Sequence, residues 1–246
     1  MADIEGVCKM KDIKMPENVK MILDKLSSKG YKAVIIGGCV RDSIMGIEPH
    51  DWDIATSAQP EEIMECFKHY NLMKAGLKHG TVTVIIDHEP YEITTYRIDG
   101  EYSDHRRPDS VDFTCDLAED IMRRDFTINA IAYDGKNIID LHDGIGDLQK
   151  GIIRCVGNAN ARFREDPLRI LRAIRFAARF GFEIEESTKK AMFDNCDMLR
   201  FIATERRQGE FTKTLCSEHV SIIKDYAKIL KYGLPCIDSI KDFDKA

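Results

Sequence analysis

The order of apolar and polar positions predicts alternating helices and strands over the first 150 residues. Residues 15–29 are predicted to form a helix, since Pro16 lies near its start and Gly30 follows its last turn. Short apolar runs at 33–37 and near 51–55 predict two strands.

A β-hairpin is predicted further along this region. Residues 81–86 and 91–96 are rich in β-branched and aromatic side chains, and the turn-forming residues 87–90 join them. The remaining predicted elements are a helix at 60–70, a polar, turn-rich loop at 98–114, a helix at 125–133 and a strand at 137–141. This alternation is typical of a mixed sheet flanked by helices that ends near residue 150.

From about residue 159 onwards the pattern is helical only. Asp166 is a suitable N-cap, Pro167 fits the first helical position, and Gly181 ends the helix. One face of this helix is apolar at 168, 171, 174, 177 and 178, and the other carries arginine at 169, 172, 175 and 179. We therefore predict an α+β fold, with a mixed-sheet domain at 1–150 followed by an all-helical domain at 151–246.

Composition argues against several classes of protein. The 246 residues, 43% of them hydrophobic, suffice for one large or two small domains. No apolar run approaches the roughly 18 residues needed to span a bilayer, and a signal-peptide pattern is absent, so no membrane partner is expected. The eight dispersed cysteines include no Cys-x-x-Cys pair, which predicts neither a zinc site nor a redox motif and indicates reduced thiols in the cytoplasm.

Charge is distributed unevenly along the chain. The net charge of −6 opposes nucleic-acid binding when it is taken alone. Residues 151–180, however, contain seven arginines, no lysine and two acids, which gives a local balance of +5. A basic stripe on an acidic protein is compatible with RNA binding.

Two aspartates separated by one residue carry the most specific chemical signal. If residues 51–55 form a strand, Asp51 and Asp53 lie on the same face and present their carboxylates side by side. Such a pair repels itself unless a cation lies between the two groups, and hard oxygen ligands of this kind suit Mg²⁺. An isolated Asp-x-Asp is more commonly part of a solvated loop, so the residues around this pair decide whether it is interpreted as a metal site.

That context is a Gly37-Gly38 turn twelve residues upstream. It follows the apolar run 33–36 and precedes residues 40–45, which are able to open a helix. A strand, a glycine turn and a helix start together form an anion site, although a Gly-Gly pair by itself is usually only a turn. The turn lacks the Gly-Lys-Ser/Thr of a Walker motif and the third glycine of a dinucleotide fingerprint. With Asp51 and Asp53, it indicates a metal-dependent nucleotide site.

These two motifs and five further segments resemble the head domain of class II tRNA nucleotidyltransferases and bacterial poly(A) polymerases, in the polymerase-β superfamily. The further segments are 92–97, 106–109, 123–130, 140–144 and 164–169, and the resemblance extends over about 190 residues. It implies a nucleotidyltransferase head at 1–150 and a helical neck with the start of a truncated body at 151–246. It also implies an enzyme that adds C, C and A to the 3′ end of tRNA from CTP and ATP, without a template, releasing pyrophosphate.

The resemblance assigns catalysis to carboxylates. Asp51 and Asp53 are the expected ligands of two Mg²⁺ ions, which stabilise the attacking and leaving oxygens. The superfamily commonly adds a third carboxylate from a nearby strand, and Glu92 is a candidate. The alternative for Glu92 is a cross-strand charge pair.

Phosphate binding is expected at the glycine turn. Backbone N–H groups of Gly37 and Gly38 would hold the triphosphate, and Arg41 would pair with its oxygens as a bidentate fork. Arg41 is alternatively a surface arginine. Asp42 is interpreted as a structural residue that braces the turn.

The ribose is expected to contact a second group of residues. Arg124 and Asp125 belong to the segment 123–130, and a helix there would place Asp125 and Asn129 on one face. By resemblance this segment distinguishes ribonucleotides from deoxyribonucleotides. Helix capping by Asp125 is an alternative.

Base selection is expected, by resemblance, at Asp166 and Arg169. A carboxylate accepts and a guanidinium donates, so the two side chains present a base-like edge to CTP or ATP. Capping alone is the alternative for Asp166. Arg172 and Arg175 would contact phosphate or the RNA backbone, or else form a solvated face.

Other functions remain open at this level. The segment 97–113, with Arg106, Arg107 and Asp109, would switch the enzyme from adding C to adding A, although the sequence alone indicates only a polar loop. A poly(A) polymerase, a CC-adding or A-adding enzyme, and a non-catalytic nucleotide- or RNA-binding module are alternatives. Family members usually continue past this length with helical domains that hold tRNA, so weak, salt-sensitive tRNA binding is expected.

Overall fold

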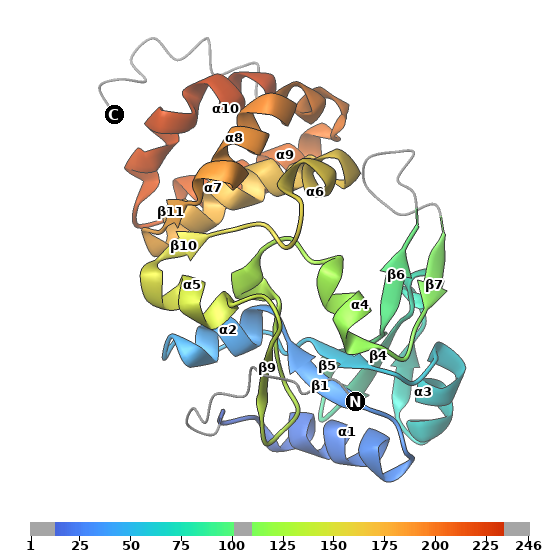
Figure 1. Cartoon of the computed structure of the whole chain (residues 1–246). Helices are drawn as coiled ribbons and strands as arrows, with labels where there is room; N and C mark the ends of the chain where they lie inside the picture. The colour runs from blue at the N-terminus through green and yellow to red at the C-terminus, as the bar shows by residue number, and fades with distance from the viewer. Residues whose placement is uncertain (1–12, 101–109, 234–246) are drawn as a thin grey trace. The chain divides into compact units, whose positions relative to one another are not determined.

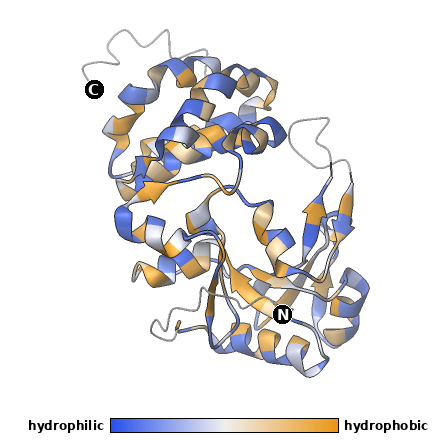
Figure 2. Ribbon diagram, in the orientation of Figure 1, coloured by the Kyte–Doolittle hydropathy of each residue, from blue (hydrophilic) through white to orange (hydrophobic). Residues whose placement is uncertain are grey.

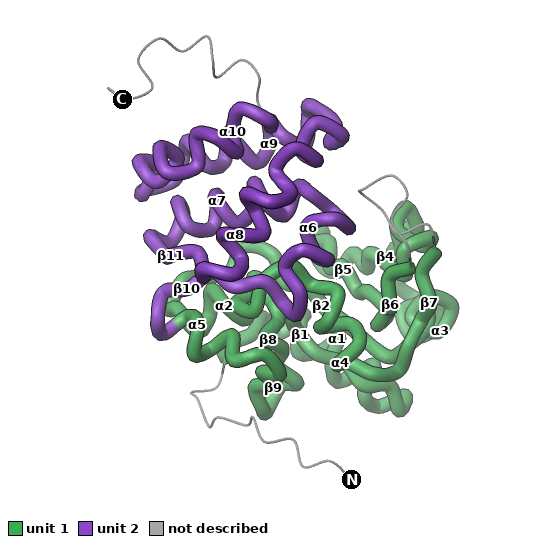
Figure 3. The backbone as a smooth tube through the Cα atoms, turned by 45° about the horizontal axis from the view of Figure 1, so that its top comes forward, with its two compact units in different colours: residues 1–100, 110–148 green, residues 101–109, 149–246 purple. Residues whose placement is uncertain are grey.

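The computed structural model describes residues 13–100 and 110–233. The described residues form two compact units, one of residues 13–100 and 110–148 and the other of residues 149–233 (Figures 1 and 3). Helices of both units carry hydrophobic and hydrophilic residues on different sides, as Figure 2 shows. No helix within the described ranges combines the length and the apolar character needed to cross a membrane.

The first unit is built on a seven-stranded mixed sheet. Its strands lie in the order β3-β4-β5-β2-β1-β8-β9. Their bounds are β1 (Ala33–Ile36), β2 (Ile54–Thr56), β3 (Asn71–Met73), β4 (Thr81–Ile86), β5 (Glu89–Thr95), β8 (Ile131–Tyr133) and β9 (Ile138–Asp140). Only β2 and β5 pair in parallel. The end of β1 therefore lies beside the starts of β2 and β8, and the last three residues of β5 pair with β2.

Helices pack against this sheet and contribute to its apolar core. They are α1 (Glu17–Ser28), α2 (Gly38–Ile44), α3 (Pro60–Cys66), α4 (Leu117–Met122), α5 (Gly144–Lys150) and the 3₁₀ turns η1 (Leu77–His79) and η2 (Thr127–Asn129). Ile22 and Leu26 of α1 and Ile63 of α3 are fully buried in the same apolar cluster as Ile35 and Ile93 of the sheet. Burial of this apolar surface is the main force that holds the layers together.

The predicted hairpin is present as β4 and β5. Asp87 and His88 connect the strands with positive φ angles of 51° and 67°, as a tight primed turn requires. A second antiparallel pair, β6 (Arg97–Asp99) and β7 (Val111–Phe113), contradicts the loop predicted at 98–114. Each strand of this pair has only three residues with mixed polarity, and so gives little periodic signal.

The helix predicted at 125–133 is also wrong. Residues 127–129 form a single 3₁₀ turn, and the chain then enters β8. Tyr133 and Ala132 pair with Ile35 and Ile36 of β1 in the middle of the sheet. Pairing with a buried strand has overridden the local helical pattern.

The second unit is mainly helical. Its elements are β10 (Ile152–Ile153), α6 (Ala159–Glu165), α7 (Leu168–Phe180), β11 (Glu183–Ile184), α8 (Glu186–Asn195), η3 (Cys196–Phe201), α9 (Thr204–Leu215), η4 (Val220–Tyr226) and α10 (Ala227–Gly233). Strands β10 and β11 form a small parallel pair that the sequence did not predict. Gly181 ends α7 with a φ of 68°. The predicted α+β class, a mixed sheet followed by helices, is confirmed.

Candidate active site

Several predicted residues of the first unit lie at one edge of its sheet. The backbone N–H of Ile36, the last residue of β1, donates to the Asp53 carbonyl at 3.1 Å. The Gly37 N–H donates to the Ile131 carbonyl, also at 3.1 Å. These bonds bring Gly37, Asp53 and the start of β8 together. They also engage the Gly37 N–H in the sheet, and phosphate binding at Gly37 and Gly38 stays a prediction.

Gly37 contributes through its missing side chain. It has a φ of 89° and a ψ of −131°, a conformation that residues with a Cβ rarely adopt. A Cβ at this position would lie 3.1 Å from Arg124 Nη1, 3.7 Å from the Asn129 carbonyl oxygen and 3.8 Å from Asp53 Oδ2. Four residues from three predicted motifs therefore converge on one point.

The two aspartates precede β2 and do not lie on it. Both are exposed, and with Glu92 they line a recess of about 580 Å³. Partial desolvation raises the pKa of the Asp53 carboxyl, the Arg124 cation lowers it, and Asp51 raises it again.

Glu92 lies on β5 and is paired in register with Thr83 of β4. Its neighbour Ile93 is paired with Ile54, the residue after Asp53. Within the described part of the chain, no group of three acidic, histidine or cysteine side chains is arranged to hold a metal ion. A role for Glu92 as a third ligand therefore stays a prediction.

Arg41 is buried, with 4% of its surface exposed, and does not lie at the surface as its alternative interpretation required. Its Nε donates to Asp42 Oδ1 at 2.8 Å, its Nη2 lies 2.7 Å from the same oxygen, and its Nη1 donates to the Asn129 side-chain oxygen. Asn129 in turn donates to Asp125 Oδ1 at 3.0 Å. Arg41, Asn129 and Asp125 thus form one connected chain of polar contacts.

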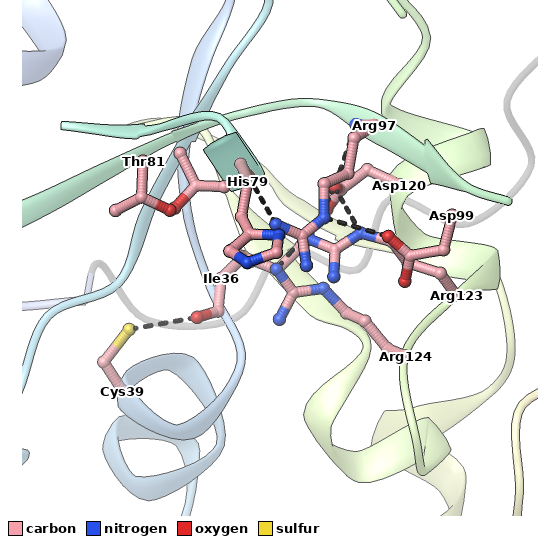
Figure 4. A network of polar contacts seen from close by, with 10 residues as sticks. Ile36, Cys39, His79, Thr81, Arg97, Asp99, Asp120, Arg123 and Arg124 are labelled. Carbon is pink, nitrogen blue, oxygen red and sulfur yellow. Dashed lines mark hydrogen bonds and ion pairs between the residues drawn. The ribbon is translucent and has the colours of Figure 1, made fainter. Parts of the chain in front are cut away.

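A buried carboxylate that the sequence analysis missed holds Arg124 in place. Asp120 Oδ2 accepts a hydrogen bond from Arg124 Nη2 at 3.4 Å, and Asp120 Oδ1 accepts one from Arg123 Nε at 2.9 Å (Figure 4). The guanidinium of Arg97 pairs with Asp99 and donates to the His79 carbonyl. Burial lowers the pKa of Arg124, while Asp120 opposes that change. The spacing of Asp120 from Arg123 and Arg124, at i+3 and i+4 of a helix, is a signal that could have identified it.

In the second unit, Asp166 acts as the predicted cap and has a further partner. Its Oδ1 accepts from the Leu168 N–H at 3.1 Å. Arg206 of α9 forms a two-nitrogen contact with the same carboxylate, at 2.9 and 3.4 Å. Capping and side-chain pairing thus coexist at Asp166. Arg206 lies 40 residues away along the chain, so no local pattern points to this contact.

Three of the four arginines of α7, at 169, 172 and 175, lie against acidic side chains. Arg169 is buried and donates from Nη1 to Glu165 Oε2 at 2.7 Å. Glu210 of α9 lies 3.0 Å from Arg175 Nε and 3.9 Å from Arg172 Nη1. These contacts fix the orientation of the predicted base-reading residues. Arg106, Arg107 and Asp109 lie outside the described residues.

Comparisons with known proteins show which families the chain resembles. The family described as the poly A polymerase head domain matches residues 33–154. The family described as a probable RNA and SrmB-binding site of polymerase A matches residues 181–239. A CCA-adding enzyme of Oceanobacillus iheyensis is 52% identical over 201 residues, 81% of this chain and 50% of that protein. One of Lactiplantibacillus plantarum is 47% identical over 81% of this chain and 49% of that protein.

Solved structures show the same relationship. The CCA-adding enzyme of Bacillus stearothermophilus, solved with CTP, gives a TM-score of 0.76 at 38% identity, covering 89% of this chain and 53% of that one. The Thermotoga maritima enzyme, solved with tRNA, gives 0.75 at 28% identity, covering 91% and 54%. The chain thus spans about half the length of these relatives. On sequence and fold, residues 33–154 of this chain belong to the family described as the poly A polymerase head domain.

Proposed function

We propose that the chain carries the catalytic part of a template-independent nucleotidyltransferase that adds C, C and A to the 3′ end of tRNA. CTP and ATP are the proposed substrates, and pyrophosphate is the product that leaves. The observation that carries this proposal is the convergence of Asp53, Arg124 and Asn129 on Gly37. We assign residues 1–150 as the catalytic head and residues 151–246 as the neck and the start of a further helical part.

Asp51 and Asp53 are the proposed ligands of Mg²⁺. Both carboxylates line the recess, and Mg²⁺ is bound in proteins by one or two carboxylates together with substrate phosphates and waters. The donor set therefore fits this ion, which when bound supplies charge stabilisation for the attacking and leaving oxygens. The protein contributes the position of the two carboxylates, fixed by the bond between Ile36 and the Asp53 backbone.

The sugar and phosphates are proposed to bind along Gly37, Gly38 and Arg124. The guanidinium of Arg124 faces Gly37 and is oriented by Asp120, so its remaining edge is available to ligand oxygens. Asn129 and Asp125 are proposed to contact the ribose, and Arg41 orients the Asn129 amide. Phosphate binding by Arg41 itself would require it to exchange one of these internal contacts.

Base selection is proposed at Asp166 and Arg169. A base edge is read reliably only by side chains held in one orientation, and Arg206 and Glu165 hold these two. Arg172 and Arg175 are proposed to contact phosphate or RNA, with Glu210 setting their orientation.

The proposed location is the cytoplasm. Among the residues that the structure describes, Cys39, Cys66 and Cys196 are buried thiols and Cys115 and Cys216 are exposed thiols, and none of these five forms a disulfide. Unpaired thiols of this kind persist in a reducing compartment.

Poly(A) polymerase is the second candidate function, because the matched head-domain family is named for that activity. The two enzymes share the transfer step and differ in where addition stops. An A-adding or CC-adding enzyme would likewise share the metal and ribose residues.

The experiment for the transfer step compares Asp53→Ala with Asp24→Ala. Asp24 is an exposed acid on α1, outside the site, and serves as the matched control. Each variant is incubated with Mg²⁺, tRNA lacking its CCA end, and labelled CTP or ATP. Loss of incorporation with both nucleotides in Asp53→Ala alone supports the proposal. Wild-type incorporation by Asp53→Ala contradicts it.

A further inference from the structure

Asp120 is a fully buried charged group that contacts Arg124 of the proposed nucleotide site. Its side chain has no exposed surface. A carboxylate is removed from water in this way only when cations and hydrogen-bond donors compensate its charge. The described partners are the guanidinium groups of Arg123 and Arg124 and the backbone N–H of Arg97.

The two carboxylate oxygens have different partners. Oδ1 lies 2.9 Å from Arg123 Nε and 2.8 Å from Arg123 Nη2, and it accepts a hydrogen bond from the Arg97 backbone N–H at 3.3 Å. Oδ2 receives Arg124 Nη2 at 3.4 Å. Asp120 therefore links the first residue of β6, at the base of the β6–β7 pair, to the arginine that faces Gly37 (Figure 4).

Arg124 has one end held and the other directed at the site. Its Nη1 would lie 3.1 Å from a Cβ on Gly37. Its Nε is buried and has no hydrogen-bond acceptor among the described residues. A buried donor without an acceptor is unfavourable, so an oxygen from a bound ligand would complete the coordination of this guanidinium.

We propose that Asp120 is a positioning residue of the nucleotide site, which holds the Arg124 guanidinium beside Gly37 and couples it to the start of β6. This inference rests on the proposed function, because it assigns to Arg124 a contact with the nucleotide. Asp120 acts only through Arg124 and touches no ligand.

The test is a double-mutant cycle in nucleotide binding by the full chain. Asp120→Asn keeps the shape of the side chain and removes its charge. CTP and dCTP binding are measured in Mg²⁺ for the wild type, Asp120→Asn, Arg124→Ala and the double variant. Asp116→Ala is the control, because it removes the N-cap bond of the same helix, Asp116 Oδ1 to the Ala118 N–H at 2.9 Å.

We expect Asp120→Asn to weaken CTP binding about tenfold, equivalent to about 1.4 kcal/mol, and to lower the CTP-to-dCTP preference as Arg124→Ala does. The double variant should bind CTP within about twofold of Arg124→Ala, because Asp120 has no further effect on CTP binding once the Arg124 guanidinium is absent. Asp116→Ala should melt earlier and keep wild-type affinity and preference. Additive losses, or a lower melting temperature of Asp120→Asn with an unchanged preference, would overturn the proposal.

A measurement on the wild-type chain does not require that the variants fold. Nitrogen-15 NMR of the arginine side chains should show slow rotation of the Arg124 guanidinium before ligand is added, and a shift of its Nε–H signal with CTP. Fast rotation, as in a solvated arginine, overturns the positioning role alone. If the wild-type chain binds neither CTP nor ATP, the proposed function is overturned. The rotation rate of the Arg124 guanidinium then still shows whether Asp120 holds it.

Discussion

Replacing Gly37 with alanine perturbs the point on which the site converges. The φ of 89° and ψ of −131° lie in a region that alanine occupies only with strain, which costs about 1–3 kcal/mol. The added methyl group would also lie 3.1 Å from Arg124 Nη1, closer than an ordinary contact. The guanidinium must therefore move by a few tenths of an ångström, since the backbone at Gly37 is fixed by its bond to Ile131.

The two effects are separable by measurement. For a chain of this size, about 1 kcal/mol shifts the melting temperature by about 2–4 °C, so the strain predicts a decrease of about 2–12 °C. Displacement of Arg124 predicts, in addition, weaker CTP binding by at least about tenfold, or about 1.4 kcal/mol. Calorimetry measures the first quantity, and titration with CTP and Mg²⁺ measures the second.

Gly30→Ala supplies the matched control. Gly30 also has a φ of 89°, but a Cβ there would have nothing within 4 Å. This variant should lose stability and keep its CTP affinity. Equal CTP affinities for Gly37→Ala and Gly30→Ala would refute the placement of the nucleotide beside Gly37.

Three further predictions concern other parts of the account. Arg206→Ala should relax discrimination against UTP and GTP about tenfold, because Asp166 loses its side-chain partner; unchanged competition would show that Arg206 is not needed for base selection. Iodoacetamide at pH 8 should modify Cys115 and Cys216 before Cys39, because burial raises the pKa of Cys39 to about 11, leaving about one thiolate in a thousand. Rapid native labelling of Cys39, read by peptide mass spectrometry, would contradict its burial. Removal of Mg²⁺ with EDTA should stop incorporation reversibly, and activity that persists in EDTA would exclude the metal.

The features predictable from the sequence are those formed by neighbouring residues. The strand before Gly37, the hairpin at 87–90 and the cap at Asp166 each depend on a few adjacent positions. Their backbone conformations follow from local chemistry, and the structure contains all three.

Features that depend on distant partners were missed or misassigned. Residues 131–133 form a strand because they pair with β1, and the local sequence pattern does not predict that pairing. The Arg206 contact joins α9 to Asp166, which lies between α6 and α7, and Arg41 contacts Asn129, which lies 88 residues away along the chain. Asp120 is the exception, since its spacing from Arg124 follows the helical repeat.

The most direct test of the central claim is the length of the product formed on defined RNA ends. tRNA transcripts that end at the discriminator base, at C and at CC are each incubated with CTP, ATP or both, and the products are resolved at single-nucleotide length. We predict that CTP extends the transcripts ending at the discriminator base and at C only as far as CC. ATP should add one residue to the transcript ending at CC, and with both nucleotides addition should stop at CCA. Long adenosine tails on any of the three RNAs, or binding of CTP without extension, would contradict it.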